Sequence, residues 1–207
     1  MLIQKKYHEI REQIQDGDII AFGGKGLISN LIKAFTFSVV SHIGIIWKGK
    51  DVAFGGKIFI RNDLIESTSL EGFSGVVVNR LSKRLKDYDG DVWWLPLSNE
   101  IRNKINFTIF YDWLKKQRKK EYDSWQAINS ALDLLPDSKE NFDKIYCAEL
   151  DAGALEISGG IPDINCSEIL PIELCRWNIY KDDHYQLSGE PKEITRYNSI
   201  KVGNWVL

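Results

Sequence analysis

The sequence predicts an α+β fold in which an antiparallel β-sheet is flanked by helices. Strand-like apolar runs dominate the first half, up to residue 97, and helical periodicity dominates from residue 98. Strands that come first, followed by helices, are typical of this class. At 207 residues the chain is long enough to bury a sizeable core, and we expect one domain over 1–207. Within it we expect a helical region at about 98–135 and a C-terminal tail from about 160.

The strands are predicted from short apolar runs bounded by turn residues. They are expected at 16–22 after an initial turn, at 41–47, at 57–68 as one strand or two, at 75–81 and at 91–97. The segment GKD at 49–51 is predicted to be a turn, and EGFSG another. Pro96 should end the fifth strand or place it at an edge, because proline cannot donate to a strand ladder. A last strand is expected near 199–207, after a polar segment.

The helices are predicted from apolar residues at helical spacing. An amphipathic helix is expected at 27–36, and glycines 159 and 160 should end a helix that begins near Cys147. Ser98 or Asn99 is a plausible cap for the helical region. Two stripes follow in that region, and we expect a helix for each: Ile101, Ile105, Ile109 and Trp113, then Trp125, Ile128, Leu132 and Leu135, the second stopped by Pro136.

The composition argues against several classes of partner. A formal charge of -2 gives no electrostatic case for nucleic acid or an anionic membrane. The longest apolar-looking stretch, 27–47, contains too many polar residues for a membrane span. Three cysteines and no secretory leader lead us to expect free thiols in the cytoplasm. No metal motif or phosphate loop is present, so no metal or cofactor is expected.

Cys147 is the first candidate for chemistry. It lies at the predicted start of a helix, where backbone N–H groups and the helix dipole favour a thiolate. A cysteine nucleophile needs an imidazole base and a third group that orients the ring. His42, in the strand SHIGIIW, and Glu66, a carboxylate in LIEST, could fill those positions. Each residue also has an explanation without catalysis. Cys147 could be a small buried side chain, His42 a histidine of the core, and Glu66 a glutamate that faces solvent.

Several motifs together resemble a known family. The run from Gly17 to Trp47, the strand LIEST, the element EYDSW at 121–125 and the segment YCAEL are similar to circularly permuted NlpC/P60-type proteins, the YiiX-like group of papain-like cysteine hydrolases. The resemblance covers about 16–155 and implies a papain-like sheet or half-barrel flanked by helices. It also implies Cys147 as nucleophile, His42 as base and then acid, and Glu66 as the residue that orients His42.

The resemblance implies a cysteine hydrolase that cleaves an amide, for example in a cell-wall-type peptide, or an ester through an acyl-enzyme. Tyr146 or Tyr122 is a candidate further donor to the oxyanion. The permuted relatives include lipid acyltransferases and phospholipases, so a lipid ester is an alternative substrate. A binding module without catalysis is another alternative, because Ala148 stands where the family usually has serine and the tail matches poorly. Cys166, in NCSEIL, is a rival nucleophile, whereas Cys175 is expected to be structural.

Overall fold

The computed structural model describes residues 1–25, 29, 33, 38–52, 56, 58–70, 73–118, 120–122 and 144–194. Within these residues seven strands form one open sheet in the order β1-β9-β6-β2-β3-β4-β5. Every neighbouring pair is antiparallel except β1 and β9, which are parallel. The strands are β1 Leu2–Gln4, β2 Ile19–Gly24, β3 His42–Val52, β4 Ile58–Leu70, β5 Phe73–Arg80, β6 Gly90–Leu95 and β9 His184–Ser188. The predicted α+β class and antiparallel sheet are thus confirmed, and the sheet is not closed into a barrel.

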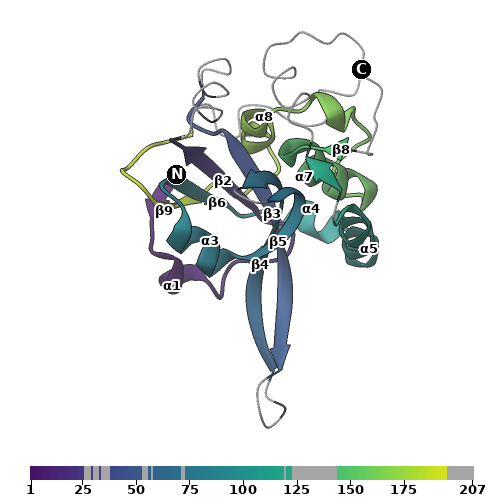
Figure 1. Cartoon of the computed structure of the whole chain (residues 1–207), viewed down its shortest axis with the longest axis horizontal. Coiled ribbons are helices and arrows are strands. Elements are labelled where there is room, and N and C mark those ends of the chain that lie inside the picture. Colours follow the sequence, from purple (N-terminus) through teal and green to yellow (C-terminus); the bar gives the residue numbers. More distant parts are fainter. Residues whose placement is uncertain are drawn as a thin grey trace.

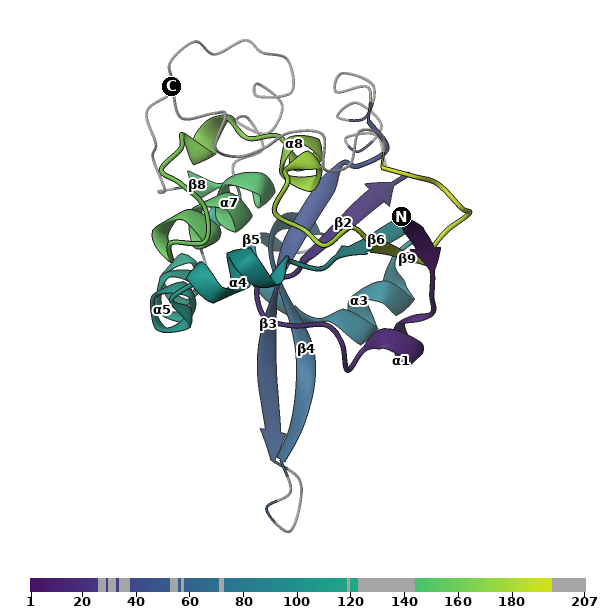
Figure 2. The same cartoon turned by 180° about the vertical axis from the view of Figure 1, so that it is seen from behind.

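Helices cover both faces of this sheet (Figures 1 and 2). One face carries α4 Asn99–Lys104, α5 Phe107–Gln117, α7 Cys147–Ile157 and α8 Pro171–Arg176, and the other carries α1 Tyr7–Ile10 and α3 Leu81–Asp87. A two-stranded parallel pair, β7 Glu121–Tyr122 and β8 Lys144–Ile145, lies beside β5, and a 3₁₀ turn, η1, spans Cys166–Glu168. The molecule therefore has three layers, with the sheet in the middle.

Alternation along the strands divides the core between the two faces. Ile43 and Ile45 of β3 belong to the larger apolar cluster with α7, whereas Ile46 belongs to the smaller cluster with Ile10 and Leu81. Successive side chains of a strand point to opposite faces, so a strand covered on both sides reads as a continuous apolar run. That is why SHIGIIW was recognisable as a buried strand.

The predicted turn at 49–51 is wrong. Gly49 pairs with Arg61, and β3 and β4 continue as a hairpin that projects from the body of the molecule (Figure 1). Gly49 permits a close approach there, since a Cβ atom would collide with the side chains of Asp63 and Arg61. Three successive apolar residues of this arm, Ile58, Phe59 and Ile60, are exposed.

The first helical stripe forms two helices, so the prediction of one helix there is wrong. Ser98 caps α4 as predicted, by accepting a hydrogen bond from the backbone N–H of Ile101. The chain then leaves helical geometry at Ile105 and Asn106. Asn106 begins α5, because its Oδ1 accepts from the N–H groups of Thr108 and Ile109. The spacing of the apolar residues alone predicts one helix, but the cap at Asn106 divides them between two helices.

Other predicted boundaries hold in part. Leu95 ends β6 before Pro96, and α7 spans Cys147–Ile157, as expected. Gly159 has a φ of 83°, the left-handed conformation that commonly follows a helix. β5 begins at Phe73, two residues earlier than predicted. The predicted helix at 27–36, the stripe from Trp125 to Leu135 and the last strand at 199–207 fall largely or wholly outside the described residues.

The C-terminal tail contributes to the sheet, although its polar segment was not predicted to do so. β9 inserts between β1 and β6 and brings the tail beside the N-terminal strand. The short elements β1, α1 and α3 were also not predicted, because each is too short to show a clear period. Among the described residues, no helix is both long and apolar enough to span a bilayer.

Candidate active site

His42 and Glu66 lie side by side in the structure. The Nε2 atom of His42, the first residue of β3, is 2.8 Å from Oε2 of Glu66 on β4. The Glu66 side chain is fully buried, and the His42 side chain is 15% exposed. Because Nε2 is engaged by the carboxylate, the second ring nitrogen is available to another partner.

Glu66 is held by two further side chains that the sequence analysis did not single out. Asn79 Nδ2 and Arg84 Nε donate to its Oε1 atom at 2.8 and 2.9 Å. Asn79 comes from the neighbouring strand, β5, and Arg84 from α3. The sequence offered one weak signal, the amide of Asn79 after the apolar run GVVV, and none for Arg84, which looks like any helical arginine.

These partners keep Glu66 ionised. Burial alone would raise its pKa, but hydrogen bonds and charges from His42 and Arg84 outweigh burial and lower the pKa to about 2. The Arg84 guanidinium is itself packed over the rings of Phe22 and Tyr88, at 4.9 Å from each ring centroid. The carboxylate beside His42 is therefore both charged and fixed in position.

Cys147 is the first residue of α7 and interacts with His42. Burial disfavours the charged imidazolium, but the charge and hydrogen bond of Cys147, together with those of Glu66, raise the pKa of His42 to about 10. Cys147 is 3% exposed. The three residues that the sequence singled out thus form one chain of contacts, from thiol to imidazole to carboxylate.

The Cys147 thiol lies at the start of α7, beside polar backbone groups. The first N–H groups of a helix have no acceptor within the helix, and the helix dipole is positive there. The first-turn N–H groups near Cys147 are thus suited to an anion. Ala148, where the resembled family usually has serine, is fully buried in the core. A serine hydroxyl at that position would need a partner inside the core, so alanine is a consistent packing choice.

Asp151, one helical turn after Cys147, is a second buried carboxyl group near the thiol. It is fully buried, and within the described part of the chain neither carboxyl oxygen has a hydrogen-bond partner. Burial, followed by the charge of Cys147, raises the pKa of Asp151 well above its usual value. Burial thus favours the neutral form of Asp151, whereas the partners of Glu66 favour its ionised form.

Of the two predicted oxyanion donors, the structure describes the side chain of Tyr146 only. Tyr146 is buried, and its hydroxyl lies 2.7 Å from the carbonyl oxygen of Ile169 and 3.1 Å from that of Ser167. Its single proton is engaged by these backbone acceptors, so we assign it no contact with substrate. Tyr122 lies in β7, but its side chain falls outside the described residues, and its role stays a prediction.

The other cysteines have different environments. Cys166, the rival nucleophile, is buried in η1, and its thiol donates to Oε2 of Glu156 at 3.0 Å. Cys175 is buried in α8, where burial raises the pKa of its thiol far above the usual value. The thiol that interacts with His42 is that of Cys147.

Comparison with known proteins gives a solved structure to set beside this geometry. No protein-family model matches the chain, and neither does any curated protein sequence. The chain is similar to the crystal structure of the metalloprotein yiiX (DUF1105) from Escherichia coli O157:H7, with 21% sequence identity and a TM-score of 0.47. The similarity covers 72% of this chain and 68% of that chain.

That neighbour is described as a metalloprotein. Within the residues that the structure describes, no group of three or more His, Cys, Asp or Glu side chains is placed to hold a metal ion. His42 and Glu66 contact each other directly, at 2.8 Å, and Glu66 is also bound by Asn79 and Arg84.

Proposed function

We propose that the protein is a cysteine hydrolase that cleaves an amide or ester through a Cys147–His42–Glu66 triad. The contact of His42 with Glu66 at 2.8 Å, with Cys147 at a helix start on its other side, supports this proposal best. A nucleophile, a base and a group that orients the base are the minimum set for such chemistry.

In the proposed mechanism Cys147 passes its proton to His42, which gives a thiolate and an imidazolium. The raised pKa of His42 supports this transfer, since the ring then holds the proton at neutral pH. The Cys147 thiolate attacks the carbonyl carbon, and the carbonyl π electrons move to the oxygen. First-turn N–H groups of α7 stabilise that oxyanion.

Collapse of the tetrahedral intermediate expels the leaving group, which takes the proton from His42. The product is a thioester on Cys147. Neutral His42 then removes a proton from water, the hydroxide attacks the thioester, and the carboxylic acid leaves as the thiolate forms again. Glu66 orients the ring and stabilises each imidazolium, and Arg84 and Asn79 hold Glu66.

Thiol labelling tests the nucleophile. Iodoacetamide at neutral pH should label Cys147 first, because a thiolate reacts and a thiol does not. Cys147→Ala should abolish the fast labelling, whereas Cys166→Ala and Cys175→Ala, the matched controls, should retain it. Fast labelling that persists in Cys147→Ala and disappears in Cys166→Ala would assign the reaction to the rival cysteine.

A second variant tests the base. His42→Ala removes the imidazolium that stabilises the thiolate, so its labelling should shift to more alkaline pH. An unchanged labelling–pH profile would remove His42 from the site. Lipid esters and γ-glutamyl or D-amino-acid peptides, offered as competitors of labelling, then distinguish an ester substrate from an amide substrate.

A further inference from the structure

Asp151 occupies the helical turn of α7 that follows Cys147. Residues four apart lie on one face of a helix, with their Cβ atoms about 5–6 Å apart. Helical side chains also lean towards the N-terminus of the helix, so the Asp151 carboxyl group leans towards the turn of Cys147. The charges of Cys147, His42 and Glu66 all act on it. Asp151 therefore belongs to the surroundings of the thiol, although it has no part in the proposed triad.

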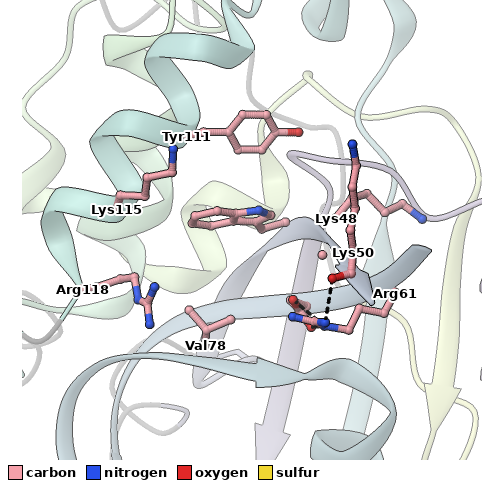
Figure 3. A pocket seen from close by; sticks show the side chains of 10 residues that line it. Lys48, Lys50, Arg61, Val78, Tyr111, Lys115 and Arg118 are labelled. Carbon is pink, nitrogen blue, oxygen red and sulfur yellow. Dashed lines mark hydrogen bonds and ion pairs between the residues drawn. The ribbon is translucent and has the colours of Figure 1, made fainter. Parts of the chain in front are cut away.

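Other buried carboxyl groups of this protein have an arginine partner. Asp63 is paired with Arg61 at 2.7 Å, beside the cavity that Figure 3 shows. Glu66 is paired with Arg84 at 2.9 Å. Asp151 is at least as buried, but neither of its carboxyl oxygens has a hydrogen-bond partner in the part of the chain that the structure describes. Its environment therefore differs from that of these carboxylates.

The carboxylic acid is the favoured form of Asp151. A buried carboxylate without a partner is costly, and burial, followed by the charge of Cys147, raises the pKa of Asp151 well above its usual value. In the acid form the group carries an O–H donor, which a carboxylate lacks. Buried donors are seldom left without an acceptor. The donor of Asp151, one helical turn from the thiol, is thus suited to an acceptor that forms during the reaction.

The elements packed on α7 supply the other groups around Asp151. They are His42 of β3, Glu66 of β4, Cys175 of α8, Cys166 of η1 and the apolar side chains of Phe110 and Leu114 of α5. Glu66 already has its own donors, and the Cys166 thiol has an acceptor of its own. Burial keeps Cys175 a neutral thiol, because it raises the pKa far above the usual value. In the proposed mechanism Cys147 is the member of this set that gains a negative charge.

We propose that the Asp151 carboxylic acid donates a hydrogen bond to the Cys147 thiolate once the thiol proton has passed to His42, an inference that rests on the proposed triad. Rotation of the Asp151 side chain brings its O–H group to the sulfur. Asp151 keeps its proton throughout, so Cys147 loses one proton and His42 gains it. Hydrogen bonds to a charged acceptor are about twice as strong as neutral ones. Burial that keeps a carboxylic acid neutral, so that it can donate to an anion, is an established device of enzymes.

Two substitutions at Asp151 test the donor through the pH profile of Cys147 labelling by iodoacetamide. Asp151→Asn keeps a donor of similar shape that cannot ionise, so its profile should match that of the wild type. Asp151→Leu keeps the approximate shape without the donor, so the thiolate forms less readily and the midpoint should move at least about one pH unit to the alkaline side. Leucine also removes a buried polar group without a partner, so urea unfolding should show no loss of stability. The matched control, Asp87→Leu on the exposed face of α3, should leave the profile unchanged.

The direction of the shift decides the role of Asp151. Acidic shifts in both variants would mean that Asp151 is an anion that opposes the thiolate, and would overturn the proposal. An unchanged profile in Asp151→Leu, or equal alkaline shifts in both variants, would also overturn it, because the donor would then have no effect or no substitute. Asp151→Ala, which removes the donor too, gives the same comparison if leucine lowers stability. Failure of the triad is seen separately, as fast wild-type labelling that persists in Cys147→Ala.

Discussion

Glu66 is fully buried and yet ionised, and its neighbours explain how. A buried carboxylate is costly unless charges and hydrogen bonds replace its water. Here His42, Asn79 and Arg84 supply those interactions. Asp151, equally buried and without such partners, has a raised pKa instead. The surroundings of two carboxyl groups near one thiol thus shift their pKa values in opposite directions.

Arg84→Met tests this account of Glu66. Removal of the cation leaves a buried carboxylate that is undercompensated, so the free energy of unfolding at pH 7 should fall by about 3–5 kcal/mol. The folded pKa of Glu66, about 2, lies below the ordinary value of 4.5. The stabilisation from its charge is therefore present above about pH 4.5 and is lost as the pH falls towards 2.

The loss caused by Arg84→Met should accordingly be largest at neutral pH and shrink towards pH 3. Urea unfolding across this range measures it, and Lys83→Met, an exposed neighbour on α3, is the control. Adding Glu66→Gln should restore part of the stability, because no buried charge then lacks its partner. A loss that does not depend on pH would mean that Arg84 acts only through packing.

At the scale of elements, the separation of α4 from α5 depends on one side chain. Asn106 accepts hydrogen bonds from two N–H groups at the start of α5. Without the break at Ile105, α5 would continue the direction of α4 and could not pack Phe110 and Leu114 into the core. The N-cap residue Asn106 therefore sets the boundary between the two helices.

Asn106→Ala should lower the free energy of unfolding by about 1 kcal/mol, because a helix loses its N-cap. Asn103→Ala, inside α4 and exposed, should instead stabilise slightly, since alanine is the better helix former. Chemical denaturation of both variants provides the measurement. Equal stabilisation by the two substitutions would indicate one continuous helix through Asn106.

At the scale of the whole molecule, Asp18 connects segments that are far apart in the sequence. Its carboxylate accepts from Trp94 Nε1 and the N–H of Leu97, both at 2.9 Å, and it pairs with Arg102. These contacts join β2, the end of β6 and α4 at one point. The Gly-Asp pair that entered the family resemblance is thus a structural anchor.

Asp18→Ala should cost about 3–5 kcal/mol in unfolding free energy, because it leaves the buried Trp94 and Leu97 donors and the Arg102 charge without an acceptor. Asp89→Ala, which breaks an exposed pair with Lys25, should cost less than about 1 kcal/mol. Urea unfolding of the two variants compares them. Similar small losses would show that water replaces Asp18 freely.

The sequence indicated much of the candidate site because its motifs are local. Cys147 precedes a stripe that ends in two glycines, and His42 and Glu66 stand out as polar residues in apolar strands. Asn79 and Arg84 could not be found in this way. Pairing of β4 with β5 sets Glu66 opposite Val77 and so brings Asn79 close, and no local period encodes that register.

The sequence by itself determined the α+β class, the buried strand at 41–47 and the helix that starts at Cys147. These follow from hydrophobic periodicity and glycine placement, which depend on near neighbours in the chain. Only the tertiary structure decided the projecting β3–β4 arm, the insertion of β9 and the partners of Glu66. Each depends on contacts between residues distant in sequence, where burial and charge compensation act through space.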